Sequence, residues 1–258
     1  MNLSAGMKLR QAATVFILIG MMVLNGCFTM SQAERDRKAQ AFHKIGISYL
    51  NENQNQRAYI QFQKAIKISP KHKESQYGIG HVFFMQGKYK EAVEAFQAAV
   101  SIDSTYSEAH NYMGKAYEAL GESAKAVSEY QKALANPQYE TPHFAHFNIG
   151  LIHLNASRYK DAAKEFRAAA QVAPDYAVAY SGLGQAYLRD GYNAEAIEAF
   201  SNAVRIAPEY TEAYFYLGQA HAQNGDSKSA RQAYEKVVKI SPDSDFSKKA
   251  KLYIDKQR

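Results

Sequence analysis

The sequence repeats one pattern six times at an almost constant interval, and this periodicity constrains the fold more than any single motif. Each copy has a glycine, an alanine twelve positions later and an aromatic residue four positions further on. A second small residue follows after three more positions; in the first copy the two small residues are Ala58 and Ala65, and in the last copy Val237 takes the second place. The glycines are Gly46, Gly80, Gly114, Gly150, Gly184 and Gly218, spaced 34, 34, 36, 34 and 34 residues apart. The aromatic residues are Phe62, Phe96, Tyr130, Phe166, Phe200 and Tyr234.

Each copy predicts two α-helices that form a hairpin. The glycine and the small residues are expected where the two helices cross, because only small side chains let helix axes approach to about 8 Å. The aromatic residue is expected to fill the gap to the next hairpin. Proline is expected to end the second helix, because it lacks an amide donor and disfavours helix in the residue before it. The prolines in these positions are Pro70, Pro174, Pro208 and Pro242.

These in-phase motifs resemble the tetratricopeptide repeat family over residues 39–244. The resemblance implies an all-α fold, a right-handed superhelical solenoid of six helical hairpins that bury their apolar faces against one another. The expected repeats are 39–72, 73–106, 107–142, 143–176, 177–210 and 211–244. Residues 245–258 are expected to form a capping helix, in which Ala250 and either Tyr253 or Ile254 cover the last apolar face.

The third repeat carries two extra residues in its terminal turn, within residues 136–142. Pro137 and Pro142 are expected to make this connection stiff and extended. We expect the insertion to divide the solenoid into two halves of three repeats each.

Residues 1–26 have the features of a secretory signal peptide. Lys8 and Arg10 form a positive region, and an uncharged apolar run of 13 residues follows from Ala12 to Leu24. As a helix this run spans about 20 Å, which is too short for a hydrocarbon core of about 30 Å. The pattern therefore predicts a signal peptide rather than a membrane span.

Residues 24–27 resemble the lipobox of bacterial lipoproteins, although Asn25 departs from the residues preferred there. The resemblance implies cleavage before Cys27 and lipid attachment to it, with residues 27–38 as a lipidated cysteine and polar tether. Phe28 replaces the aspartate that retains enterobacterial lipoproteins in the inner membrane, which favours the periplasmic face of the bacterial outer membrane. The alternative is an ordinary signal peptide followed by an accidental cysteine.

The charge of the chain gives no indication of nucleic-acid binding. Its 31 basic and 25 acidic residues give a net charge of +6, and removal of Lys8 and Arg10 would leave 6 − 2 = +4. This mild excess is interleaved with acids, as on an ordinary solvated surface. A single cysteine excludes an intrachain disulfide framework.

No pattern in the sequence favours catalysis, a cofactor or a small-molecule substrate. His143, His146 and His153 could suggest zinc, but their spacing is irregular and His153 occupies a core position of the repeat. The Ser-x-Gly-x-Gly motif at Ser181 lies within a predicted helix, without the strand–turn–helix context that a nucleophile needs. We therefore expect no metal and no enzyme activity.

The first helices of the repeats are expected to line a concave groove that binds a protein partner. In the resembling family the groove positions are the second, fifth, ninth and twelfth of each unit, and repeat four has the most apolar set. An apolar stripe of this kind could accept an extended segment or an amphipathic helix. The alternative is that some of these side chains pack inside the solenoid or against the terminal helix. The candidate residues are His43, Ile47, Leu50, Tyr77, Phe84, Asn111, Phe147, Leu151, Leu154 and Phe215.

The overall layout also resembles one particular family. A lipobox, a short tether, six repeats and a longer third repeat are similar to the type IV pilus biogenesis lipoproteins, the PilF/PilW pilotins. This resemblance implies binding of a secretin subunit and help with its assembly in the outer membrane. A general adaptor lipoprotein for cell-wall or envelope-assembly proteins is the alternative function.

Overall fold

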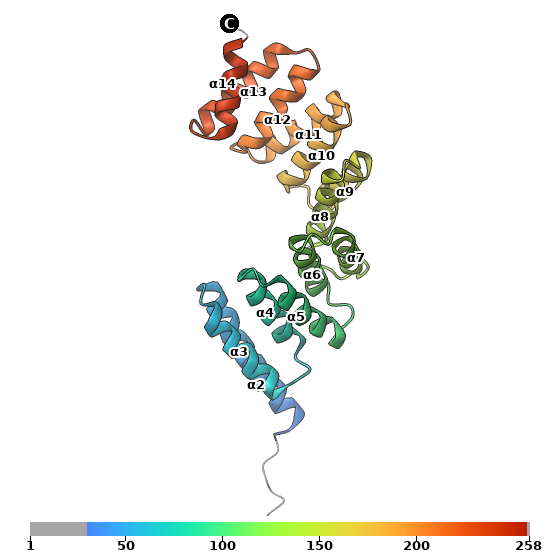
Figure 1. The fold of residues 1–258 in the computed structure, drawn as a ribbon, viewed down its shortest axis with the longest axis vertical. Helices are drawn as coiled ribbons and strands as arrows, with labels where there is room; N and C mark the ends of the chain where they lie inside the picture. The colour runs from blue at the N-terminus through green and yellow to red at the C-terminus, as the bar shows by residue number, and fades with distance from the viewer. Residues whose placement is uncertain (1–29, 257–258) are drawn as a thin grey trace, which may run out of the picture. The chain divides into compact units, whose positions relative to one another are not determined.

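The computed structural model describes residues 30–256, and this part of the chain contains thirteen α-helices and no β-strand (Figure 1). From α2 to α13 the helices form six hairpins, which confirms the predicted all-α repeat fold. In chain order they are α2 (Gln32–Asn51), α3 (Asn55–Ile68), α4 (Lys73–Met85), α5 (Tyr89–Ile102), α6 (Ser107–Ala119), α7 (Ser123–Leu134), α8 (Pro142–Asn155), α9 (Tyr159–Val172), α10 (Ala177–Arg189), α11 (Asn193–Ile206), α12 (Thr211–Gln223), α13 (Ser227–Ile240) and α14 (Asp245–Lys256).

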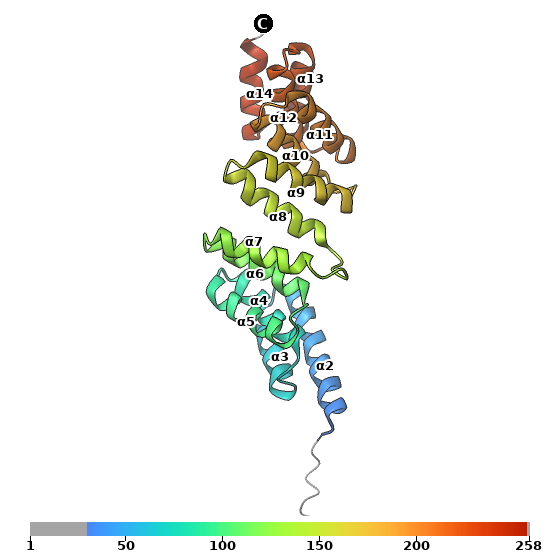
Figure 2. The same cartoon turned by 90° about the vertical axis from the view of Figure 1, so that its right-hand side faces the viewer.

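The chain divides into two compact units, each with a core of its own. The first unit ends at Ser75, within the first turn of α4, and the second begins at Gln76. In the second unit successive hairpins lie as layers from α5 to α14 (Figure 2). The core of the first unit consists of Ala39, Ala58, Phe62 and Ala65, all fully buried.

Each hairpin is built around the glycine and the aromatic residue of the repeat. A Cβ atom added to Gly80 would lie 2.5 Å from the Phe96 ring of the same hairpin, closer than real Cβ contacts. The glycine is therefore required for the ring to fit between the two helices. The aromatic residue was expected to fill the gap to the next unit. Its ring also packs against the glycine of its own hairpin. In repeat four Phe166 meets both glycines, Gly150 of its own hairpin and Gly182 of the next.

Prolines and left-handed turns mark the ends of the helices. The four helices that precede the repeat prolines, α3, α9, α11 and α13, each end two residues before the proline, as predicted. Between the two helices of a hairpin one residue adopts a positive φ, for example Gly121 at 77°. Asn53 and Ser157 take this conformation in hairpins one and four, where no glycine is present.

The N-terminal end of α2 differs from the expected tether. Helix begins at Gln32, so residues 32–38 continue the first helix instead of forming a polar linker. The reason is a capping box: the Ser31 hydroxyl accepts from the Glu34 amide, and the Glu34 carboxylate accepts from the Ser31 amide at 2.8 Å. The Ser-x-x-Glu spacing is visible in the sequence and predicts this start.

The inserted turn after repeat three does not divide the chain as predicted, because the boundary between the two units lies within α4. Tyr139, inside the insertion, is only 6% exposed and joins one apolar cluster with residues of α7 and α8. This ring thus belongs to the core that α7 and α8 share. The extended connection also ends earlier than expected, because Pro142 is the first residue of α8, where a missing amide donor costs nothing.

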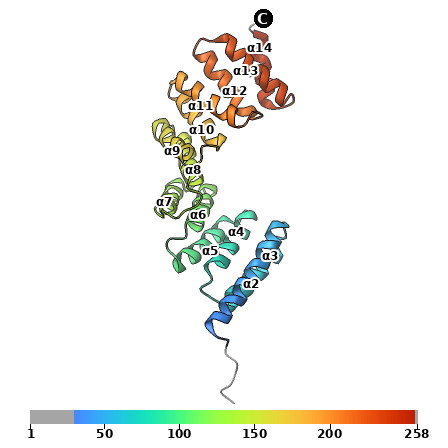
Figure 3. The same ribbon diagram turned by 180° about the vertical axis from the view of Figure 1, so that it is seen from behind.

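Helix α14 covers the last hairpin (Figure 3). Ala250 and Ile254 are buried in a cluster with Tyr234 and Val237 of α13, and Tyr253 packs at its edge. The opposite side of α14 is exposed and carries lysines, as a terminal repeat requires for solubility.

Candidate functional site

Helix α8 has the most apolar sequence of the described helices. Its sequence is apolar on nearly every side, which is typical of a helix that is covered all round. One side is covered, because Ala145, Ile149 and Ile152 are buried in the core. A second side is only half-buried, and Phe144 on this side is 42% exposed. We call this second side the apolar face of α8, and it consists of Phe144, Phe147, Leu151 and Leu154.

Helix α6 carries a stripe of polar side chains, in contrast to the apolar face of α8. Glu108, Asn111 and Lys115 follow at intervals of three and four residues, so they share one side of the helix. Asn111 is 6% exposed, and its side-chain oxygen has no hydrogen-bond partner among the described residues. The Lys115 ammonium lies over the Tyr112 ring, 4.7 Å from its centre, and 5.7 Å from the centre of the Phe84 ring. We call Glu108, Asn111 and Lys115 the polar stripe of α6.

The two surfaces meet in a cleft of about 380 Å³ inside the second unit. The cleft lies beside α6 and α8 and is closed by residues of the turns before α8 and α10. The walls of the cleft combine the polar stripe of α6, part of the apolar face of α8 and residues of two turns, namely Glu108, Asn111, Tyr112, Lys115, Tyr139, Thr141, Phe144, Phe147, Asn148 and Tyr176.

Two of the candidate groove residues, Asn111 and Phe147, therefore line one cleft. Leu151 and Leu154 continue the apolar face of α8 and pack at the edge of the cluster around Phe166. Phe147 packs on the same ring, with centres 5.5 Å apart, so it has a structural role as well.

Other candidate groove residues are covered by aromatic neighbours. The Tyr77 ring lies 5.4 Å from Tyr106 and 5.6 Å from Phe96, and burial raises the pKa of its hydroxyl. Phe215 lies against Phe246 in the first turn of α14, with 5.1 Å between ring centres. Tyr77 thus packs inside the solenoid and Phe215 packs against the terminal helix, which are the two forms of the alternative given above.

In the first unit three candidates lie on α2. His43 packs between Phe62 and His72, at 5.4 Å from each ring, and burial lowers the pKa of its imidazole. Ile47 is 37% exposed and Leu50 is half-buried. Cys27, the predicted lipidation site, lies outside the described residues.

The sequence interpretation missed three aromatic residues of the cleft. Tyr112 was not at a groove position, and Tyr139 and Tyr176 lie in turns. The signal for Tyr176 is present in the sequence, because the residue before α6, α10 and α12 is a tyrosine each time. Tyr139 gives no such signal, since it occurs only in the inserted turn.

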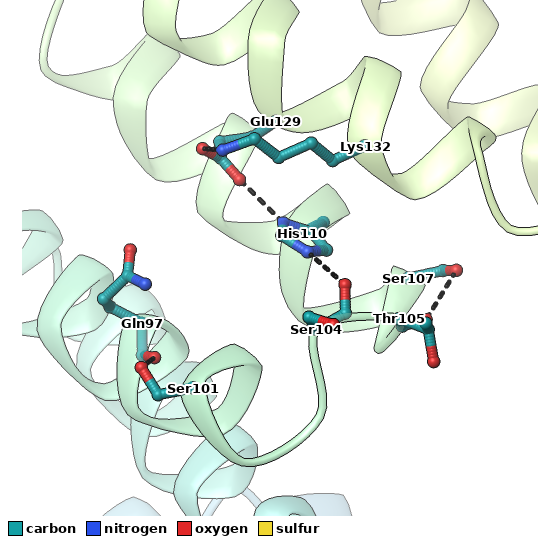
Figure 4. Close-up of polar contacts among 8 residues, drawn as sticks. All are labelled: Gln97, Ser101, Ser104, Thr105, Ser107, His110, Glu129 and Lys132. Atoms are coloured by element: carbon teal, nitrogen blue, oxygen red, sulfur yellow. Dashed lines mark hydrogen bonds and ion pairs between the residues drawn. The ribbon is translucent and has the colours of Figure 1, made fainter.

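Two histidine–glutamate pairs hold the hairpins on either side of the cleft. The buried His110 of α6 contacts the Glu129 carboxylate of α7 at 2.7 Å and the Ser104 carbonyl at 3.2 Å (Figure 4). Burial alone would raise the pKa of Glu129, but hydrogen bonds from His110 and Lys132 outweigh it and lower this pKa. Thirty-six residues later the pair recurs between α8 and α9, where the hydrogen bond from His146 lowers the pKa of Glu165.

The histidines considered for zinc are engaged separately. His146 pairs with Glu165, whereas the His143 ring lies 4.1 Å from that of Phe144. Residues 30–256 contain no group of three His, Cys, Asp or Glu side chains arranged to hold a metal ion. Within the same range no helix is both long and apolar enough to cross a membrane.

Comparison with family models identifies the class of protein. A tetratricopeptide repeat model matches residues 113–177, 147–211 and 182–245, and a second one matches residues 39–72. A TPR repeat model matches residues 80–121. The chain belongs to the tetratricopeptide repeat family, whose members are scaffolds for protein interaction and typically act without catalysis. No curated protein sequence matches the chain.

Solved structures share this fold over most of its length. The crystal structure of PilW, described as a widely conserved type IV pilus biogenesis factor, has a TM-score of 0.72 at 18% identity, covering 85% of this chain and 99% of PilW. The structure of PilF of Pseudomonas aeruginosa has a TM-score of 0.75 at 16% identity, covering 84% of this chain and 98% of PilF. The structure of YrrB, described as a TPR protein with an unusual peptide-binding site, has a TM-score of 0.62 at 19% identity, covering 74% of this chain and 97% of YrrB. At these identities the similarity establishes the fold.

Proposed function

We propose that this protein is a pilotin-like lipoprotein that binds a secretin subunit at the outer membrane and assists assembly of the type IV pilus secretin. The observation that carries the proposal is the half-exposed apolar face of α8 beside the cleft. An apolar surface that stays accessible on a helix of a folded scaffold is typical of a protein-binding site. The similarity of fold to PilW and PilF over nearly their whole length supports this choice of partner.

The proposed mechanism is physical. Acyl chains on Cys27 would hold the repeats at the periplasmic face of the outer membrane, since each buried methylene contributes about 0.8 kcal/mol of membrane affinity. Capture of a secretin segment by the cleft would then raise its effective concentration where the ring assembles. Anchoring and capture can be tested separately.

Partner capture is tested by affinity purification of the tagged full chain from gently solubilised envelopes. Phe144→Asp is the informative variant, because Phe144 is 42% exposed and its loss spares the core. Leu252→Asp on α14 is the matched control, since Leu252 is 64% exposed and lies outside the cleft. We expect the wild type and Leu252→Asp to recover a secretin and Phe144→Asp to lose it. Recovery of cell-wall enzymes without a secretin would replace the proposal by the envelope-adaptor alternative.

Anchoring is tested by Cys27→Ser followed by cell fractionation. We expect the wild type to sediment with the outer membrane and to resist extraction by salt, and the variant to become soluble in the periplasm. A variant that still sediments with the outer membrane and resists salt would contradict lipid anchoring. This outcome would leave the partner proposal standing, because the cleft lies in the second unit, far along the chain from Cys27.

A further inference from the structure

The side chains that line the cleft favour one conformation of a bound segment. Five aromatic rings contribute to its walls, together with the side-chain amides of Asn111 and Asn148. Grooves lined by aromatic rings bind polyproline II segments, whose backbone groups make no internal hydrogen bonds and are free to pair with polar side chains. The buried Asn111 oxygen lacks a partner and can accept a hydrogen bond from the N–H of a residue other than proline in such a segment. The ring contributors are Tyr112, Tyr139, Phe144, Phe147 and Tyr176.

Two charges of opposite sign stand at the two ends of the polar stripe. Glu108 and Lys115 both line the cleft, and neither makes an ion pair with another described residue. They are seven positions apart, which corresponds to about 10.5 Å along the axis of α6. In a polyproline II segment residues i and i+3 lie on one side and are about 9.3 Å apart. The two spacings differ by only about 1 Å.

We propose that the cleft binds a partner segment in the polyproline II conformation, with a basic side chain at Glu108 and an acidic side chain three residues away at Lys115. The apolar or proline residues between the two charges pack on Phe144 and Phe147. The inference deepens the proposed function, because it describes the segment that the partner inserts into the same site. It requires no assumption about which partner protein carries the segment.

The test uses two fluorescein-labelled peptides with the cores Lys-Pro-Pro-Glu and Glu-Pro-Pro-Lys in identical flanks. They have the same composition and net charge, so only the order of the charges distinguishes them. We expect the purified full chain to bind one order about threefold to tenfold more tightly than the other in fluorescence anisotropy. The charge-exchanged variant Glu108→Lys, Lys115→Glu is expected to reverse this preference. Replacing both prolines by glycine in the better peptide is expected to weaken its binding, because the flexible segment must be ordered.

The matched control exchanges two exposed charges of α5, Lys90→Glu with Glu94→Lys, and is expected to keep the wild-type preference. The single variants Glu108→Gln and Lys115→Gln are each expected to reduce the preference towards unity. Equal binding of the two orders, a preference that survives the charge exchange, or no binding of either peptide overturns the proposal. The outcome is independent of the secretin experiment, because purified chain and synthetic peptides are the only components.

Discussion

At the residue scale, the pairing of glycine with an aromatic ring sets the geometry of every hairpin. Replacing a helical glycine by alanine ordinarily stabilises a helix by about 1 kcal/mol. At Gly80 the added methyl would lie 2.5 Å from the fully buried Phe96 ring, and overpacking of this kind costs about 1–3 kcal/mol. We therefore predict that Gly80→Ala lowers the free energy of unfolding, measured by denaturant titration. The same change in a Phe96→Leu background should be neutral or stabilising; an equal loss in both backgrounds would contradict the steric explanation.

The ionisation of Glu129 makes the stability of the folded chain depend on pH. Its pKa is lower in the folded chain than its ordinary value of 4.5, so its stabilising contribution is complete above about pH 5. The contribution is lost as the pH falls through the folded-state pKa. We predict that Glu129→Gln lowers the free energy of unfolding by about 1–3 kcal/mol at pH 7, because the pair with His110 is buried. The difference from the wild type should shrink as the pH falls towards 3.

The matched control is Glu122→Gln, whose carboxylate lies at the surface and pairs with Lys125. Surface pairs contribute little, so this variant should stay within about 0.5 kcal/mol of the wild type at every pH. A difference between Glu129→Gln and the wild type that is independent of pH would show that shape, not charge, accounts for the loss.

At the element scale, α14 covers the apolar side of the last hairpin. Ile254 is 9% exposed and packs in the cluster of Tyr234 and Val237, whereas Leu252 on the same helix is 64% exposed. We predict that Ile254→Ala costs about 2–3 kcal/mol and Leu252→Ala less than about 0.5 kcal/mol. Hydrogen exchange should localise the effect of Ile254→Ala to α12, α13 and α14. Equal costs for the two variants would show that α14 does not seal the core.

Most elements follow from the sequence for a physical reason. The interval of 34 residues fixes six hairpins, because glycine, alanine and one aromatic ring are needed wherever two helices cross closely. Helix starts depend on local capping, and Ser31 with Glu34 extends α2 into residues that otherwise resemble a linker. The cleft is harder to predict, because it exists where packing is incomplete. Tyr139 and Tyr176 reach it from turns, and the periodicity of helices carries no information about turn side chains.

At the scale of the whole molecule, the chain consists of two units with separate cores. In repeat proteins stability is nearly a sum of local terms and contacts between neighbours. A cavity in one unit should therefore destabilise that unit and leave distant repeats protected. Phe62 and Phe200 are both fully buried and occupy equivalent repeat positions in the first and the second unit. They form a matched pair for this comparison.

We predict that Phe62→Ala and Phe200→Ala each cost about 3–5 kcal/mol locally, by loss of apolar contacts and creation of a cavity. In hydrogen exchange followed by mass spectrometry, Phe62→Ala should lose protection in α2 and α3 and keep it in α10 and α11. Phe200→Ala should show the reverse. Loss of protection throughout the chain in both variants would mean that the two units unfold as one. Local unfolding would allow the binding cleft in the second unit to stay intact while the first unit opens, so peptide binding by Phe62→Ala should equal that of the wild type.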